Sequence, residues 1–264
     1  MTTFETLELS ERAPGVVAVT MSRADVFNAF DETMIDELDR AFEQLIDDDG
    51  VRIIVLASEG KHFSAGADLN WMQRASEASR EWNFADARKF AAMLSRIDHC
   101  PKPTLARIQG AALGGGVGLA CACDIVIAAD NARFAISEAK FGILPATIGP
   151  YLVNAIGPRQ ARRLALTTTR IDARAAHALG LVHEVVALDE LDRAVDACLQ
   201  ELIVGGPNAQ AEIKAFLGAL EVGPVTEDVL EFSAQTISRV RGSDEAREGF
   251  AAFLAKRKPK WIPE

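Results

Sequence analysis

Residues 51–58, VRIIVLAS, restrict the possible folds more than any other segment of this sequence. The run is nearly continuously apolar, which is typical of a strand that is buried on both faces of a sheet. It lies between two segments, 31–50 and 80–100, whose apolar residues recur at helical spacing. A buried strand that alternates with amphipathic helices predicts the α/β class.

This alternation continues to about residue 190 and then stops. Further β-rich runs before that point are TLELS (6–10), GVVAVTMS (15–22), PTLARI (103–108), CDIVIAAD (123–130), ARFAIS (132–137) and LVHEVV (181–186). We therefore divide the chain into a mixed core, residues 1–190, and an all-helical region, residues 191–264. The later helices cannot bury all their apolar faces on one another, so we expect them to pack on the core or on a neighbouring subunit.

The composition disfavours several classes of partner. With 28 Lys and Arg against 38 Asp and Glu, the formal net charge is −10, which argues against nucleic acid as the main partner. Every long apolar run is interrupted by Gly, Asp or Arg, so no membrane span is expected. The N-terminal MTTFETLELS lacks the basic start and apolar core of a signal peptide. Four cysteines do not make a disulfide framework, and Cys121 and Cys123 have no histidine nearby, so we predict a cytoplasmic protein with reduced thiols and no metal site.

Two loops rich in Gly and Ala form the candidate site. Residues 57–72, ASEGKHFSAGADLNWM, follow the buried strand, and residues 110–125, GAALGGGVGLACACDI, follow the strand 103–108. Each loop runs from a strand into a predicted helix, where the first backbone N–H groups lack partners. Two such N–H groups that converge on one oxygen form an oxyanion hole, whereas small residues also permit close helix packing. The pattern alone leaves both roles open.

The paired loops, together with ARFAISEAKFGILPA (132–146) and FLAKRKPKW (253–261), resemble the crotonase family, also called the enoyl-CoA hydratase/isomerase superfamily. The resemblance covers essentially the whole chain. It implies a crotonase-like spiral of ββα units with a C-terminal helical trimerisation region. It also implies a homotrimer, or a hexamer made of two trimers, that acts on an acyl-CoA thioester. CoA is then part of the substrate, and no separate cofactor and no metal are implied.

The resemblance also implies roles for individual residues of the two loops. The backbone N–H groups of Ala67 and Gly115 are expected to hold the oxygen of an enolate intermediate, so a side chain at Gly115 is expected to block the thioester while leaving the fold intact. Asp68 is also expected to order the first loop or to cap the helix after it. Trp71 is an acyl-chain contact or an ordinary core residue. The expected substrate contacts are Ala65, Asp68, Gly114, Gly118 and Trp71.

Contacts with the phosphates of CoA are expected from basic residues. Arg23 is the only cation in the segment RADVFNAF (23–30), which departs from the family's usual proline and basic residues there. The terminal AKRKPKWIPE (255–264) offers Lys256 and Lys260. This basic run either binds an anionic group or is a solvated tail.

One of the two carboxylates that are usual in hydratases of this family is missing. Gly118 stands at the position of the first glutamate, and Glu138 stands at the position of the second. Glu138 lies between apolar segments, where desolvation would raise its pKa and suit it to proton transfer near neutral pH. A carboxylate carried by the substrate is expected either to occupy the space next to Gly118 or to order the water instead.

A single glutamate supports two reactions on an enoyl-CoA. It can activate water for addition at Cβ and return a proton to Cα, or it can move a proton between two carbons and so shift the double bond. The stretches SAGADLNWM (64–72) and LPATIGPY (144–151) are similar to bacterial 3-methylglutaconyl-CoA hydratases. We therefore predict hydration of a branched or carboxylated enoyl-CoA. The alternatives are a Δ3,Δ2-enoyl-CoA isomerase and a non-catalytic relative that binds acyl-CoA or RNA.

Overall fold

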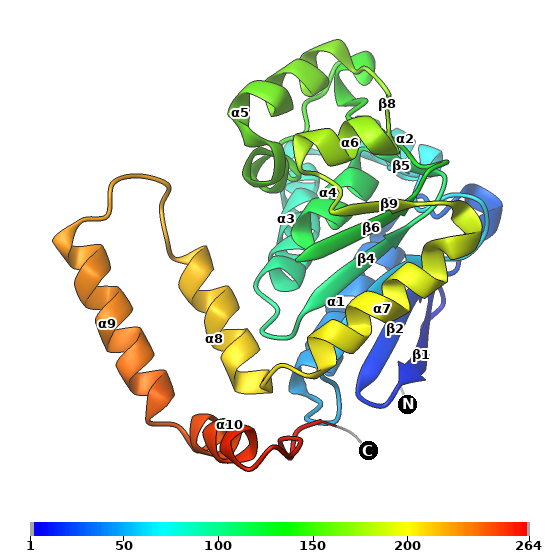
Figure 1. Cartoon of the computed structure of the whole chain (residues 1–264). Coiled ribbons are helices and arrows are strands. Elements are labelled where there is room, and N and C mark those ends of the chain that lie inside the picture. Colours follow the sequence, from blue (N-terminus) through cyan, green and yellow to red (C-terminus); the bar gives the residue numbers. More distant parts are fainter. Residues whose placement is uncertain (1–2, 263–264) are drawn as a thin grey trace.

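Six strands form the main sheet of the protein, whose computed structural model describes residues 3–262 (Figure 1). Their spatial order is β1-β2-β3-β4-β6-β9. Only β1 and β2 are antiparallel, and every later neighbour in the sheet is parallel. The strands are β1 (Leu7–Ala13), β2 (Val16–Met21), β3 (Ile53–Ser58), β4 (Thr104–Ile108), β6 (Ile125–Ala129) and β9 (Glu184–Val186).

The centre of this sheet is the apolar run from which the fold class was predicted. All six residues of β3 are buried, and β3 is hydrogen-bonded to parallel strands on both sides. A parallel strand needs cover on both faces because its connections run through helices. The prediction of a doubly covered strand is therefore confirmed.

Helices cover the two faces of the sheet. On one face α1 (Glu32–Asp47) and α3 (Arg80–Asp98) enclose the larger core, and on the other α7 (Leu191–Ile203) packs against β2, β3 and β4 (Figure 1). Helix α1 begins where the sequence indicates, because the carboxylate of Asp31 accepts the N–H of Met34 at 2.9 Å.

A second, smaller sheet carries the candidate site. It has the order β5-β7-β8 and contains β5 (Ala111–Leu113), β7 (Arg133–Ala135) and β8 (Ile171–Asp172). Strand β5 lies inside what the sequence shows only as a Gly/Ala loop. The helices around this sheet are α2 (Leu69–Glu77), α4 (Gly115–Ala122), α5 (Gly149–Thr167) and α6 (Ala173–Leu179).

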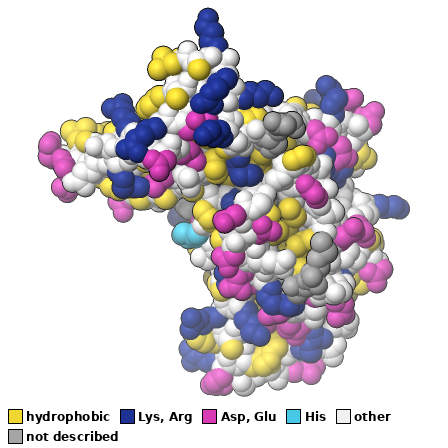
Figure 2. All heavy atoms as spheres, turned by 90° about the horizontal axis from the view of Figure 1, so that it is seen from below, with side chains coloured by type: hydrophobic (Ala, Val, Ile, Leu, Met, Phe, Trp, Pro, Cys, Tyr) yellow, Lys and Arg dark blue, Asp and Glu magenta, His cyan; other side chains and the backbone are white. Residues whose placement is uncertain are grey.

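The last three helices form an arm that stands off the core (Figures 1 and 2). They are α8 (Pro207–Gly218), α9 (Glu227–Arg241) and α10 (Asp244–Leu254), and Ala252 is the only residue in them classed as buried. The boundary drawn at residue 190 follows the change of pattern in the sequence. In packing terms, however, α7 belongs to the core, because its Leu191, Val195 and Leu199 are buried against the sheet. The free-standing arm therefore begins at α8.

Polar contacts fasten the arm to the core. Lys214 of α8 forms an ion pair with Asp124 at 2.6 Å, and Arg52 donates to the carbonyl oxygens of Gly205 and Trp261. Asp124 also accepts the backbone N–H and the hydroxyl of Thr104, so its carboxylate joins the start of β4 to the arm. Among the helices of residues 3–262, none is long and apolar enough to cross a membrane.

Candidate functional site

The two Gly/Ala loops run side by side, as an oxyanion hole would require. Ser64 and Ala112 form a parallel bridge, in which the N–H of Ser64 donates to Ala111 and the N–H of Leu113 donates to Ser64, both at 2.9 Å. The loops touch again further on, because a Cβ built on Gly66 would lie 2.9 Å from the carbonyl oxygen of Leu113. Since Ala67 and Gly115 each come three residues after the bridged pair, the two loop ends face the same region.

Both N–H groups assigned to the oxyanion hole are free to bind a ligand. Gly115 is the first residue of α4, so its N–H has no acceptor within the helix. Ala67 is exposed, and its N–H makes no hydrogen bond to the part of the chain that the structure describes, although Gly66 and Asp68 on either side both bond to Phe30. Two unpaired donors on adjoining loops are the arrangement that stabilises a developing oxyanion.

Each glycine of the triplet 114–116 has a neighbour where a side chain would be. A Cβ on Gly114, which has φ of 48°, would lie 3.1 Å from Oε1 of Glu138. On Gly115 it would lie 3.0 Å from the ring of Phe90 and 3.2 Å from that of Phe30. On Gly116 it would lie 2.9 Å from Cβ of Ser64. The glycines therefore permit close packing of the loops and rings, and they leave the N–H of Gly115 free for a ligand.

Glu138 lies at the N-terminus of α4, beside the N-cap residue Gly114. It opens the short 3-10 turn Glu138–Phe141 that follows β7, and its side chain is half-buried. Burial raises the pKa of this carboxyl group, while the backbone N–H groups of Glu138 and Ser137 lower it less, and no charged side chain is among the causes of the shift. Its Oε2 is buried without a hydrogen-bond partner among the described residues. Such a carboxyl group is suited to exchange a proton with a substrate that fills the site.

Asp68 and Arg23 hold the first loop in place. Asp68 is 7% exposed and caps α2 by accepting the N–H groups of Asn70 at 2.9 Å and Trp71 at 3.3 Å, as expected for its position. Arg23 contacts Asp68 at 3.2 Å, Asp31 at 2.9 Å and the carbonyl oxygen of Ala29 at 2.7 Å. This guanidinium is thus engaged in joining the β2–α1 connection to the loop, which counts against its expected contact with CoA phosphates.

Trp71 and Ala65 lie at the edge of the same loop. Trp71 is half-buried, donates its indole N–H to Asp86 at 3.2 Å and meets the ring of Phe90 edge-on. Ala65 is half-buried and donates its N–H to Phe27 at 2.9 Å. Phe30 and Phe90 lie behind Gly115. They were not singled out from the sequence because an apolar residue looks the same there whether it lines a core or a site.

The space next to Gly118 is not vacant. A Cβ built there would collide with Cγ2 of Ile148, lie 2.9 Å from Cβ of Ile148 and lie 3.7 Å from Leu94. Gly118 and Ile148 are both buried. The expectation that a substrate carboxylate occupies this space is therefore wrong, because an isoleucine side chain already fills it.

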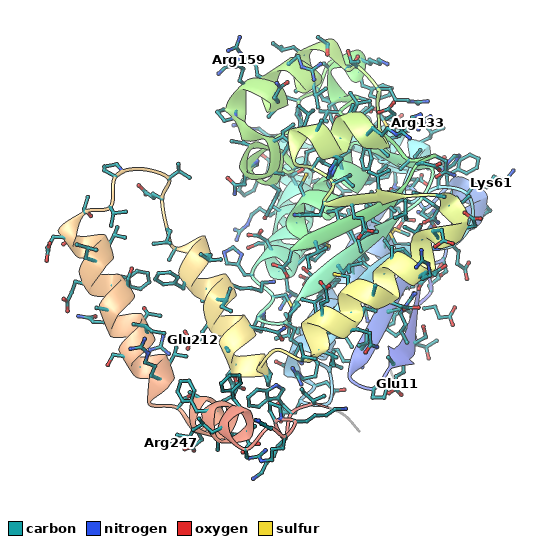
Figure 3. All side chains as sticks on the ribbon, in the orientation of Figure 1. Glu11, Lys61, Arg133, Arg159, Glu212 and Arg247 are labelled. Atoms are coloured by element: carbon teal, nitrogen blue, oxygen red, sulfur yellow. The ribbon has the colours of Figure 1, made fainter. Side chains whose placement is uncertain are left out.

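Lys256 and Lys260 are exposed and lie far from Glu138 of their own chain. The carbonyl oxygen of Trp261 accepts a hydrogen bond from Arg52, which immediately precedes β3, whereas the loop with Ala67 follows the opposite end of β3. Figure 3 shows the same separation, with Lys61 at the start of that loop and Arg247 of α10 on opposite sides of the molecule. These lysines therefore do not line the candidate site of their own chain.

The histidine and thiol groups of this region are structural. Nδ1 of His62 accepts the N–H of Ala111 at 3.0 Å and so ties the first loop to the second. Burial raises the pKa of the Cys121 thiol to about 12 and that of Cys123 further, so both stay protonated at neutral pH. Within residues 3–262, no group of three or more His, Cys, Asp or Glu is placed to hold a metal ion.

Comparisons with known proteins identify the family and the fold of the chain. A family model described as enoyl-CoA hydratase/isomerase matches residues 11–263. An enoyl-CoA hydratase of Alternaria alternata, ACTT6, is 37% identical over 241 residues, which cover 90% of this chain and 78% of the relative. The crystal structure of an enoyl-CoA hydratase from Shewanella pealeana has a TM-score of 0.94 at 40% identity and covers 98% of this chain and 96% of its own. AtuE of Pseudomonas aeruginosa has a TM-score of 0.92 at 41% identity, and the match covers 98% of this chain and 100% of AtuE. The predicted α/β fold with C-terminal helices is thereby confirmed.

Proposed function

This chain belongs to the enoyl-CoA hydratase/isomerase family, and on that premise we propose that it adds water across the α,β double bond of an enoyl-CoA thioester. The observation that carries the proposal is the placement of Glu138 beside Gly114, at the start of the helix whose first N–H is free. A proton-transfer group and an oxyanion donor thus share one end of α4. The half-buried carboxyl of Glu138 has a raised pKa, as a general acid and base near neutral pH requires.

The proposed reaction has two proton transfers and one enolate. The carboxylate of Glu138 takes a proton from water as the water oxygen bonds to Cβ, and the electron pair of the double bond moves onto the thioester oxygen. The N–H groups of Ala67 and Gly115 stabilise this negative charge. Glu138 then gives the proton to Cα as the thioester carbonyl re-forms. Every atom of water ends on the product, and the enzyme returns to its starting state.

For the acyl group we propose a branched or carboxylated chain, such as that of 3-methylglutaconyl-CoA. The support is the similarity of SAGADLNWM (64–72) and LPATIGPY (144–151) to hydratases of that substrate. Because Ile148 fills the space at Gly118, a carboxylate on the substrate would lie elsewhere along the acyl chain.

The rate of hydration can be measured by the loss of the absorbance of the enoyl thioester. We expect 3-methylglutaconyl-CoA to be hydrated much faster than crotonyl-CoA, since the latter lacks both the branch and the carboxylate. A preference for crotonyl-CoA would contradict the assignment of the acyl group but not the hydration. Conversion of a 3-enoyl-CoA into its 2-enoyl isomer without addition of water would instead establish the isomerase. The single carboxylate of Glu138 is compatible with that alternative as well as with hydration. Binding without any turnover would indicate a non-catalytic relative.

We also propose that the arm packs against further copies of the chain in a trimer or a pair of trimers. Large apolar side chains of the arm are exposed on the single chain, including Leu217, Val222, Leu230, Phe250, Phe253 and Leu254, and Figure 2 shows hydrophobic patches among the charged ones there. Exposed apolar surface of this kind is usual at an interface. Lys256 and Lys260 would then contact CoA at a neighbour's site. Light scattering should give three or six chain masses, and a single chain mass would refute the assembly.

A further inference from the structure

The side chain of Ile148 fills the space next to Gly118. Both Cβ and Cγ2 of Ile148 lie too close to permit even a methyl group at position 118. Ile148 is 1% exposed and stands at the N-cap of α5, where its side chain makes no capping hydrogen bond. Its role there is thus to fill space rather than to cap the helix.

This filled space lies one turn of α4 away from Glu138. The N–H of Gly118 donates to the carbonyl oxygen of Gly114 at 3.2 Å, so the two glycines are neighbours along the helix. A Cβ on Gly114 would lie 3.1 Å from Oε1 of Glu138, whereas a Cβ on Gly118 would collide with Ile148 and lie 3.7 Å from Leu94. A side chain at position 118 would therefore leave α4 one turn after the glycine that Glu138 faces, toward Ile148.

We propose that Ile148 is the specificity-determining residue that limits this site to one carboxylate, by occupying the volume that a side chain at position 118 would need. It places hydrocarbon beside Glu138 where a second acid could otherwise stand. The chemistry of the site is thereby restricted to reactions that one proton-transfer group can complete. The inference rests on the proposed role of Glu138, but the contact between positions 118 and 148 does not depend on it.

The first test is a double-mutant cycle in thermal melting. Gly118→Glu alone is expected to lower the melting temperature sharply, by about 5 °C or more, because the new side chain collides with Ile148. Ile148→Gly removes the colliding atoms, and glycine is well tolerated at an N-cap. The two changes together should therefore lower the melting temperature by clearly less than the sum of the two separate effects. Ile148→Val is the matched control, since it keeps both the β-carbon and a γ-methyl group and should not relieve Gly118→Glu.

The second test asks whether a side chain at position 118 lies beside Glu138. The carboxyl group of Glu138, labelled with ¹³C and assigned by its loss in Glu138→Gln, is titrated by NMR in two paired variants. In Gly118→Glu with Ile148→Gly a second carboxylate should raise the pKa of Glu138 by about one unit relative to Gly118→Gln with Ile148→Gly, because two close like charges disfavour ionisation.

Additive melting effects, relief by Ile148→Val as large as by Ile148→Gly, or equal titrations in the Glu and Gln variants would each overturn the proposal. Neither readout uses turnover. If the wild-type chain failed to hydrate any enoyl-CoA, the proposed function would fail while these results would still decide the role of Ile148.

Discussion

Glu138→Gln is expected to lower the turnover of an enoyl-CoA by a factor on the order of 10²–10⁴, the range for loss of one positioned proton-transfer group. Glutamine has nearly the same shape, so it keeps the packing against Gly114 but cannot exchange a proton. No hydrogen bond to Oε2 is lost, because that atom has no partner among the described residues. The loss should therefore appear in kcat, while calorimetry should show CoA binding close to that of the wild type.

The pH dependence of kcat/KM provides a second test of the role of Glu138. Because burial raises the pKa of Glu138, the ionised form that accepts a proton from water is lost as the pH falls through this raised pKa. The acid limb of kcat/KM in the wild type should lie above the usual range of a glutamate and should vanish in Glu138→Gln. Wild-type turnover in the variant would remove Glu138 from the mechanism.

Replacement of the Ala67 peptide bond by an ester, which removes only the N–H, is expected to lower kcat by roughly 10²–10³-fold. This is the effect of losing one donor of an oxyanion hole. The N–H of Ala67 makes no hydrogen bond within the described residues, so the ester should not disturb the loop. The measurement is the turnover of a semisynthetic chain that carries lactic acid in place of Ala67.

An ester at Leu69 is the matched control. Leu69 begins α2 and is 80% exposed, and its N–H also has no intrahelical acceptor, but it lies two residues after Ala67 and is not one of the expected oxyanion donors. Its ester should leave kcat within about twofold of the wild type, an effect well below the loss of an oxyanion donor. A similar loss from both esters would indicate a general effect of the modification, and no loss from either would show that Ala67 does not face the reacting oxygen.

A backbone probe is preferable to a substitution at Gly115. The sequence suggests that a side chain there would block the thioester and leave the fold intact. The structure directs that side chain at the rings of Phe90 and Phe30, with a Cβ only 3.0 Å from the first. Gly115→Val would therefore displace core aromatics as well, and a loss of activity in this variant would have two causes.

Local patterns were sufficient for most of the secondary structure. The β-rich runs TLELS and GVVAVTMS and the helical spacing in 31–50 depend on neighbouring residues, and β1, β2 and α1 form there as predicted. β5 was missed because its three residues lie within a run of Gly and Ala, and β8 was missed because it has only two residues. Both strands are held by pairing with β7. The two loops lie side by side because each follows a strand of one parallel sheet, and the sequence left this proximity open.

The sequence by itself determined the α/β class, the strand–loop–helix segments that expose backbone N–H groups, and Glu138 as the candidate acid and base. These features follow from short-range periodicity and from residue chemistry, or from a motif contained in a few contiguous residues. Only the tertiary structure decided which volumes are filled and which charges are already paired. Ile148 fills the space at Gly118, Arg23 is held by Asp31 and Asp68, and Lys256 and Lys260 lie at the opposite end of β3. The physical reason is that packing and ion pairing join residues distant along the chain, and a residue's type does not specify the neighbour that the fold brings to it.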